Sequence, residues 1–414
     1  MTSPGSINKI TKKMVAYLLM FTIFFGTFIS FPSGIQAQEV SFPDLDSQSA
    51  ILMEFSRGEI IFSKNGSEPL PPASLTKIMT LLLSYEALQS ERISWDEETV
   101  VSQKAWETGG SQMFLEIGQK VTIGDLITGI AVVSANDACV AIGEHLYGSE
   151  AIFVQEMNKK AAELGLKNTQ FQNSSGLPHP DHYTTAEDLA VLSRYLIKNF
   201  PEYLKLHSQT QFTFNDIDQY NLNPLLGRYP GADGLKTGHT SEAGHCLAGT
   251  AAQDGLRFIT VTMNASKTEK RLTDNETMLN YAFRNYTLAK ILPAGETITS
   301  IRVTGGEERQ LDLILENPLE TVVPFDRQED LKLEYNVPES APAPVEKGAP
   351  LGSIEVLLDG KKLTEEPLLA ATDIEKAGTF SLILRSVTDF FSGLWQKLLQ
   401  IISNLLFNSL GQNG

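Results

Sequence analysis

Three short polar motifs follow one another along the chain, and together they constrain its fold more than any other feature of the sequence. SLTK at residues 74–77 opens an apolar helical run, SAN at residues 134–136 lies in a turn between helical patterns, and KTG at residues 236–238 leads into a predicted strand. Each motif alone is weak, because S-x-x-K also occurs at residues 6–9. In this order and context, they require a fold that brings a helix start, a turn and a strand to one site.

The first motif supplies a candidate nucleophile, Ser74, and a candidate base, Lys77. Residues three apart on a helix share a face, so the Lys77 amine can reach the Ser74 hydroxyl. A lysine can take the serine proton only when its amine is neutral at the working pH. Burial and a neighbouring cation both lower the pKa of a lysine, and Lys236 is the candidate second cation.

The other two motifs supply groups for proton transfer and substrate binding. Ser134 is predicted to relay a proton to the departing amine, while Asn136 offers a donor and an acceptor to a substrate amide. Lys236 would also attract an anionic substrate. The backbone N–H of Ser74 can face a developing oxyanion, and a second N–H is expected just after Gly238. Because Gly238 has no side chain, an extended peptide could lie against that strand edge.

The chain is acidic, with 33 basic and 50 acidic residues and a formal net charge of −17, which argues against nucleic acid as a partner. Its 414 residues, 42% of them hydrophobic, leave room for two or three globular domains. Cys139 and Cys246 are predicted to be buried small hydrophobes, because a Ser-Lys mechanism needs no thiol. Six histidines without an H-E-x-x-H pattern give no strong metal site, and we expect no cofactor.

Residues 1–37 have the pattern of a secretory signal peptide. Three lysines precede an apolar run at residues 14–31, and Ala37 suits a cleavage site. The run is also long enough to span a bilayer, and Ile35 is bulky for a residue so close to a cleavage site, so an uncleaved anchor is the alternative. In either case we expect catalysis outside the cytoplasm.

Residues 379–414 have apolar side chains at spacings of three and four, a pattern typical of an amphipathic helix. Such a stripe is also found in core helices, but this one is strongly apolar, rich in Phe and Trp, and is the last element after a completed domain. We therefore expect residues 380–410 to lie on a membrane surface. Three charged residues interrupt the apolar pattern, which argues against a helix that spans the membrane.

Between the two ends, the patterns predict two domains. The first, at residues 38–291, suggests a sheet covered by helices, with a helical insert. Its predicted elements are a hairpin at 50–63, strands at 244–252 and 257–264, and helices at 71–89, 124–146, 150–164, 186–198 and 270–290. At residues 292–378, short alternating runs predict a small all-β domain with a Pro-rich loop at residues 338–350.

Four segments carry a resemblance to a known family: PPASLTKIMT (71–80), SANDACV (134–140), NSSGLPHPDHYTTAEDLA (173–190) and ADGLKTGHT (232–240). They resemble the D-alanyl-D-alanine carboxypeptidases, low-molecular-mass penicillin-binding proteins of the serine peptidase S11 family. The resemblance implies an α/β (α+β) catalytic domain of the serine β-lactamase and penicillin-binding transpeptidase type, with an antiparallel sheet covered by helices. Residues 292–378 resemble the β domain of that family, and residues 379–414 resemble its membrane anchor.

The resemblance also implies a reaction. A peptidoglycan stem peptide would acylate Ser74 and release its terminal D-alanine, with Lys77 as the base, and water would then free the enzyme. β-Lactam antibiotics would be covalent inhibitors. The enzyme would work as a peripheral membrane protein at the outer face of the cytoplasmic membrane. Lys236, Thr237 and His239 would line the substrate strand.

Two further residues match positions of the family. Arg271 matches an arginine associated with the terminal carboxylate of the substrate, and a guanidinium fork suits that group. The alternative is a surface arginine on the closing helix. His182 lies where the family has a histidine near the site, and both a structural and a catalytic role are open for it.

Three other functions share parts of this pattern. A β-lactamase has the same fold and motifs, but the E-x-x-L-N pattern of a class A deacylation site is absent after Ser134. A DD-endopeptidase needs the same chemistry with a roomier acceptor side. A non-catalytic wall-binding protein would have degenerate motifs, yet all three motifs are complete here.

Overall fold

The computed structural model describes residues 42, 44–378 and 394–402. The predicted signal peptide at residues 1–37 and most of the predicted C-terminal helix lie outside the described residues; within that helix, residues 394–402 are helical. Over the part of the chain that is described, no helix is both long enough and apolar enough to cross a membrane.

A five-stranded antiparallel sheet lies at the centre of the first domain, in the order β2-β1-β9-β8-β7. The hairpin predicted at 50–63 and the strands predicted at 244–252 and 257–264 are confirmed. β7, which carries the KTG motif, lies at the edge of the sheet. The strands are β1 (Ser49–Glu54), β2 (Ile60–Lys64), β7 (Ala232–Thr240), β8 (Gly244–Gln253) and β9 (Leu256–Ala265).

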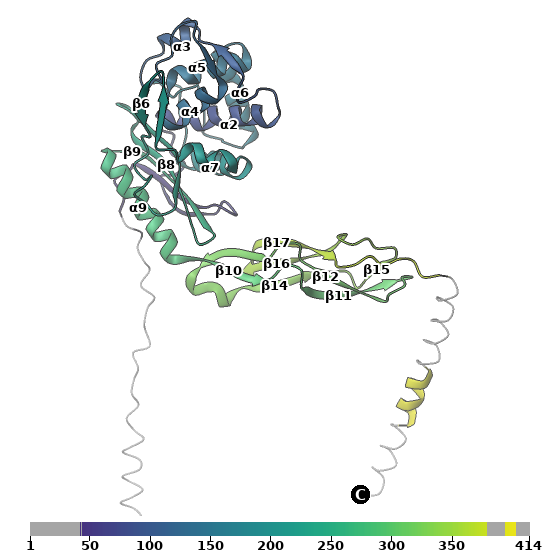
Figure 1. Ribbon diagram of the computed structural model, residues 1–414. Helices are drawn as coiled ribbons and strands as arrows, with labels where there is room; N and C mark the ends of the chain where they lie inside the picture. Colours follow the sequence, from purple (N-terminus) through teal and green to yellow (C-terminus); the bar gives the residue numbers. More distant parts are fainter. Residues whose placement is uncertain (1–41, 43, 379–393, 403–414) are drawn as a thin grey trace, which may run out of the picture. The chain divides into compact units, whose positions relative to one another are not determined.

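Helices cover both faces of this sheet (Figure 1). Helix α9 (Thr268–Asn285) packs against β8 and β9, while α7 (Ala186–Asn199) packs against β1 and β9 from the opposite side. Because both faces are covered, every residue of β1 is buried. The sheet is therefore the middle layer of the domain, as expected for an apolar sheet that must bury both its faces.

A group of helices lies between β2 and β7 in the chain, where the sequence predicts a helical insert. Thr122, Ser149 and Thr185 fix the starts of three of these helices, since each accepts a backbone N–H from the residue three positions later. The elements are η1 (Ala73–Thr76), α2 (Lys77–Gln89), α3 (Gln103–Glu107), α4 (Ile123–Val132), α5 (Asn136–Tyr147), α6 (Glu150–Glu163), α7, η2 (Pro201–Tyr203) and α8 (Leu204–His207).

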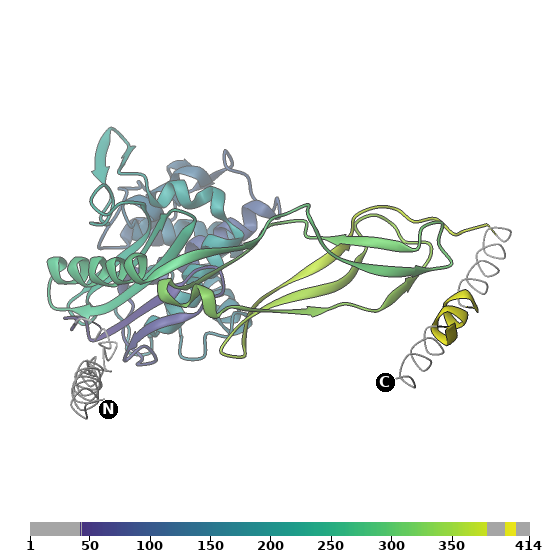
Figure 2. The ribbon, with the colours of Figure 1, turned by 90° about the horizontal axis from the view of Figure 1, so that it is seen from below.

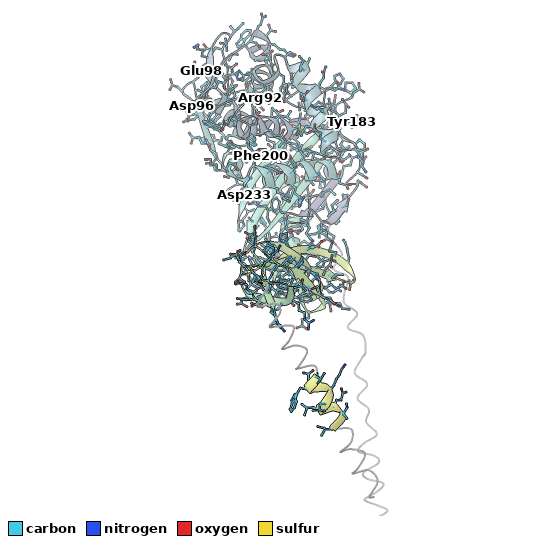
Figure 3. The ribbon with its side chains drawn as sticks, turned by 90° about the vertical axis from the view of Figure 1, so that its right-hand side faces the viewer. Arg92, Asp96, Glu98, Tyr183, Phe200 and Asp233 are labelled. Atoms are coloured by element: carbon cyan, nitrogen blue, oxygen red, sulfur yellow. The ribbon has the colours of Figure 1, made fainter. Side chains whose placement is uncertain are left out.

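The turn predicted at the SAN motif is confirmed: the helical pattern at 124–146 forms two helices, α4 and α5, with Ser134 between them and Asn136 as the first residue of α5. Ser134 has a φ of +64°, a left-handed conformation that interrupts a right-handed helix. Two small hairpins, β3 (Glu98–Val100) with β4 (Lys120–Thr122) and β5 (Gln211–Phe214) with β6 (Ile217–Tyr220), complete this region. Figure 3 shows Asp96 and Glu98 on one flank of the domain and Tyr183 on the other.

The closing helix α9 ends at Asn285, earlier than the predicted end at residue 290. The chain continues directly into β10 (Tyr286–Leu292), which pairs with β13 (Leu319–Pro324). Pairing with a strand from a later part of the chain is a tertiary contact, and such contacts override local helix propensity.

Six strands form the sheet of the second domain, in the order β14-β16-β17-β12-β11-β15. Figure 2 shows the long strands of this domain running side by side. Their buried Ile, Leu and Val side chains form a core of their own. The Pro-rich stretch at residues 338–350 is only partly the predicted loop, because β15 pairs in parallel with β11. The elements are β11 (Thr297–Thr304), β12 (Gln310–Ile314), η3 (Phe325–Asp330), β14 (Lys332–Asn336), β15 (Ser340–Pro342), β16 (Pro350–Leu358) and β17 (Lys361–Ala370).

Candidate active site

Ser74 lies in the 3₁₀ turn η1, and Lys77 is the first residue of helix α2. Residues three apart eclipse each other in a 3₁₀ helix, so the turn keeps the two side chains on one face. The Lys77 Nζ lies 2.8 Å from the Ser74 Oγ. Ala73, which opens the turn, has a φ of +48°, a costly conformation for a residue with a Cβ.

The Lys77 amine is completely buried and has two further partners. Its Nζ donates to the Asn136 Oδ1 at 2.6 Å and to the Ser175 backbone oxygen at 2.7 Å. A carbonyl oxygen only accepts hydrogen bonds, so these two oxygens take both N–H groups of a neutral amine. The remaining lone pair then faces the Ser74 hydroxyl. Burial lowers the pKa of Lys77 to about 8, which makes this neutral form accessible.

The SAN motif holds Lys77 and a neighbouring loop. The Asn136 Nδ2 donates to the Gly109 backbone oxygen at 2.7 Å, so both polar atoms of this side chain have partners within the protein. Asp137 continues the connection, since its carboxylate accepts the backbone N–H groups of Met113 and Leu115, each at 3.1 Å. The turn between α4 and α5 is therefore fixed to residues 109–115.

The KTG motif lies directly beside the turn η1, which carries Ser74. Lys236 is buried, and burial together with the charge of Lys77 lowers its pKa well below the usual value. A Cβ on Gly238 would lie 3.1 Å from the Ser74 backbone nitrogen and 2.9 Å from the Pro72 oxygen. Gly238 thus allows β7 to approach the turn that carries Ser74, in addition to leaving the strand edge open.

Arg271 and His239 differ in exposure: Arg271 is buried, whereas His239, on β7, is exposed. Arg271 is only 7% exposed, so its alternative interpretation as a surface arginine is wrong. Its Nη1 donates to the backbone oxygens of Gly238 and Cys246, each at 3.2 Å, while the buried Nε has no partner among the described residues. His239 is exposed, and its ring stacks on that of His245 with the centroids 4.2 Å apart.

Comparison with known proteins identifies the family. The model of the D-alanyl-D-alanine carboxypeptidases, peptidase family S11, matches residues 36–267, and that of the C-terminal domain of penicillin-binding protein 5 matches residues 286–376. The chain belongs to the D-alanyl-D-alanine carboxypeptidase family. Its predicted activity, that of a hydrolase with carboxypeptidase specificity, and its predicted fold class are confirmed.

Individual relatives cover most of the chain. D-alanyl-D-alanine carboxypeptidase DacF of Bacillus subtilis is 36% identical over 83% of this chain and 90% of its own length. The crystal structure of penicillin-binding protein 5 from Haemophilus influenzae is 34% identical, with a TM-score of 0.70 over 81% of this chain and 99% of that one. Penicillin-binding protein D2 of Listeria monocytogenes, solved in an ampicillin-bound form, is 34% identical, with a TM-score of 0.54 over 58% of this chain and 100% of that one.

Cys139 and Cys246 are free and completely buried, as predicted. Burial raises the pKa of the Cys139 thiol to about 12 and that of the Cys246 thiol to about 11. Both side chains are therefore neutral thiols packed in the domain core.

Sequence reasoning missed the role of the turn at residues 173–176, which provides the Ser175 oxygen to Lys77. The Asn173 Oδ1 holds this turn by accepting the backbone N–H groups of Ser175 at 3.2 Å and Gly176 at 2.7 Å. Gly176 has a φ of +86°, and a Cβ there would lie 1.8 Å from the Ala73 oxygen. An Asn followed by Gly three residues later is a turn signal, but it does not reveal which carbonyl meets the lysine.

His182 contacts the turn η1 through Thr76. The Gln172 backbone N–H donates to its Nδ1 at 3.3 Å, so the proton is on Nε2, which lies 2.9 Å from the Thr76 Oγ1. Thr76 in turn donates to the Ala73 oxygen at 2.8 Å. Burial lowers the pKa of His182 to about 4, so the ring is neutral. Of its two predicted roles, these contacts favour the structural one.

Proposed function

We propose that the protein removes the terminal D-alanine from peptidoglycan stem pentapeptides through an acyl-enzyme on Ser74. One observation carries this proposal: the buried Lys77 amine lies 2.8 Å from the Ser74 Oγ and has two carbonyl oxygens as its other partners. Lys77 takes the hydroxyl proton while the Ser74 Oγ attacks the carbonyl carbon of the penultimate D-alanine. The backbone N–H groups of Ser74 and His239 stabilise the resulting oxyanion.

Collapse of the tetrahedral intermediate breaks the peptide bond and releases D-alanine. The proton that Lys77 holds passes through the Ser134 hydroxyl to the departing amine, so this step leaves Lys77 neutral again. A water molecule then attacks the ester carbon, with Lys77 accepting its proton. That proton returns to the Ser74 Oγ as the shortened peptide leaves. β-Lactam antibiotics acylate the same Oγ and are covalent inhibitors.

The substrate lies extended along the edge of β7, which pairs with a peptide backbone by the rules of an edge strand. Lys236 and Thr237 bind its anionic end, and Asn136 positions its amide through contacts that adjust when the substrate enters. Arg271 contributes positive charge to the carboxylate site from behind the strand, because its guanidinium holds the backbone oxygen of Gly238.

Four segments divide the work: residues 1–37 export the chain, residues 38–291 catalyse, residues 292–378 form the β domain, and residues 379–414 attach the enzyme to the outer face of the cytoplasmic membrane. The attachment is supported by the helical residues 394–402, where all the large apolar side chains are exposed. These are Leu394, Trp395, Leu398, Leu399, Ile401 and Ile402.

Deletion of residues 380–414 tests this attachment. We expect the truncated protein to move from the membrane fraction to the soluble fraction when expressing cells are broken and centrifuged. A truncated protein that stays with the membranes would assign the anchor to the apolar segment near the N-terminus instead.

The catalytic proposal is tested by covalent labelling with a fluorescent penicillin. We expect the parent protein to be labelled and to release D-alanine from a defined pentapeptide, and Ser74→Ala to do neither, because no other described side chain has the Lys77 amine as its base. Absence of label on the parent would favour the wall-binding alternative, and rapid loss of label would favour a β-lactamase. Faster cleavage of a cross-linked dimer than of the pentapeptide would favour an endopeptidase.

A further inference from the structure

Helix α2 holds the turn at residues 173–176 at two consecutive carbonyl groups. Lys77 donates to the Ser175 oxygen at 2.7 Å, and Thr80 donates to the Ser174 oxygen at 2.6 Å. Since Lys77 and Thr80 are three residues apart, both lie on the face of α2 that contacts the turn. The direction of the Ser175 carbonyl therefore depends on Asn173, which holds the Gly176 N–H of the same peptide unit, and on how Ser174 is held on its other side.

Glu150, the first residue of helix α6, holds that other side. Its Oε1 accepts the Ser174 backbone N–H at 3.0 Å and the Ser174 hydroxyl at 2.6 Å. Its Oε2 lies 2.7 Å from the Nζ of Lys104, on helix α3. Burial acts to raise the pKa of Glu150, but hydrogen bonds from Lys104 and Ser174 outweigh it and lower the pKa. The carboxylate is therefore ionised and nearly buried, and each of its two oxygens has a hydrogen-bond or ion-pair partner.

We propose that Glu150 is a positioning residue of the reaction: by fixing Ser174, it directs the Ser175 carbonyl at the Lys77 amine. The inference rests on the proposed function, in which Lys77 is the base. If Ser174 is released, Asn173 still holds the Gly176 N–H, but the Ser175 oxygen shifts from its position 2.7 Å from Nζ. This weakens one of the two acceptor contacts that keep the lone pair of the amine toward the Ser74 hydroxyl.

The ion pair with Lys104 is not what the turn requires. The Lys104 side chain is 57% exposed, and an ion pair with such a partner contributes little. What Ser174 needs is an acceptor oxygen at the position of Oε1. Glutamine keeps that oxygen and loses the charge, whereas aspartate keeps the charge but is one methylene shorter, so it cannot reach Ser174 as Glu150 does.

Four variants of the full-length protein separate these effects: Glu150→Ala, Glu150→Asp, Glu150→Gln and Lys104→Ala. The rate constant for acylation by a fluorescent penicillin is measured for each, together with kcat and KM for D-alanine release from a pentapeptide. Thermal unfolding reports whether each variant is folded. Glu150→Asp and Glu150→Gln are both conservative at a helix start, so they are the decisive pair if Glu150→Ala does not fold.

We expect acylation and kcat to fall about tenfold in Glu150→Ala and Glu150→Asp, with KM nearly unchanged, because a displaced base slows chemistry without removing a substrate contact. Glu150→Gln and Lys104→Ala should stay within about threefold of the parent. The proposal is overturned if Glu150→Asp acylates as fast as the parent, or if Glu150→Gln is as slow as Glu150→Asp. Failure of the proposed function would look different, since the parent itself would then take no label.

Discussion

At the scale of single residues, the partners of the Lys77 amine allow it to change protonation state without moving. As an ammonium it donates three hydrogen bonds, to the Ser74 Oγ, the Asn136 Oδ1 and the Ser175 oxygen. As an amine it keeps the two bonds to carbonyl oxygens, and the Ser74 hydroxyl rotates to donate to its lone pair. In the proposed mechanism, the same heavy-atom positions therefore serve Lys77 before and after proton transfer, which is what a preorganised site requires.

This geometry gives a pH dependence. Because burial lowers the pKa of Lys77 to about 8, the neutral base becomes more abundant as the pH rises through that value. We expect the acylation rate constant to rise about tenfold per pH unit below the midpoint and to level off above it, as for any single general base. Stopped-flow acylation by a penicillin between pH 6 and pH 9.5 measures this profile.

The parent's circular dichroism over the same range is the control, since unfolding at either extreme would distort the profile. A rate constant that stays flat over the whole range would contradict the assignment of Lys77 as a base with this pKa.

The sequence predicted the contact between Ser74 and Lys77, because their spacing alone places them on one helix face. It predicted neither acceptor of the amine: Asn136 was expected to bind a substrate amide, and the Ser175 oxygen belongs to the backbone and has no residue type to mark it. Glu150 was missed for a related reason: at the start of a helix an acidic residue is already explained by the helix dipole, so nothing in the sequence points to Ser174.

At the scale of elements, the nucleophile turn η1 is held between two backbone segments that approach it through glycines. Gly238 brings β7 against the Ser74 backbone nitrogen, and Gly176 brings the turn at residues 173–176 against the Ala73 oxygen. The Thr76 hydroxyl, bonded to the same Ala73 oxygen and to His182, closes the third side. These contacts compensate for the positive φ of Ala73, since strained backbone persists only where its surroundings enforce it.

Gly176→Ala tests this arrangement. A Cβ there would lie 1.8 Å from the Ala73 oxygen and would also strain a φ of +86°, so the turns must separate. We expect the free energy of unfolding to fall by about 3 kcal/mol and acylation to fall with it. Urea denaturation and penicillin labelling measure the two effects.

Gly165→Ala is the matched control, because Gly165 has a similar φ of +73° but nothing within 4 Å of its Cβ position. It should cost about 1 kcal/mol and leave acylation unchanged. Equal losses of acylation in both variants would mean that backbone strain, and not contact with the nucleophile turn, matters at Gly176.

The ends of helices and strands were predictable where local turn residues set them. They were not predictable where pairing with a distant strand sets them. The strands predicted at 244–252 and 257–264 are separated where β8 ends and β9 begins, because the turn residues Asp254 and Gly255 mark this boundary locally. The turn between α4 and α5 was predicted at residues 134–136, but no Gly or Pro marks it, so the sequence did not show that Ser134 adopts a left-handed conformation.

At the scale of the whole molecule, the two domains have separate cores and are joined by polar contacts as well as by the continuous chain from α9 into β10. Arg57, in the turn between β1 and β2, donates from its Nη1 to the Thr321 Oγ1 at 2.8 Å and the Val322 oxygen at 2.6 Å. Its side chain is only 17% exposed. These charge-assisted bonds fasten β13 to the catalytic domain without touching the site.

Arg57→Ala should therefore loosen the joint and leave the chemistry intact. We expect about 2 kcal/mol less stability, as for loss of hydrogen bonds to a charged group, and faster proteolytic cleavage near residues 286–296. Penicillin acylation should remain within about twofold of the parent, because Lys77 and its partners all lie in the first domain.

Arg228→Ala is the control. It removes an exposed ion pair with Glu276 inside the catalytic domain and should change neither cleavage nor acylation. If Arg57→Ala slowed acylation as much as it accelerated cleavage, the contact between the two domains would be needed for acylation at Ser74. The two domains would then have separate cores but would not function independently.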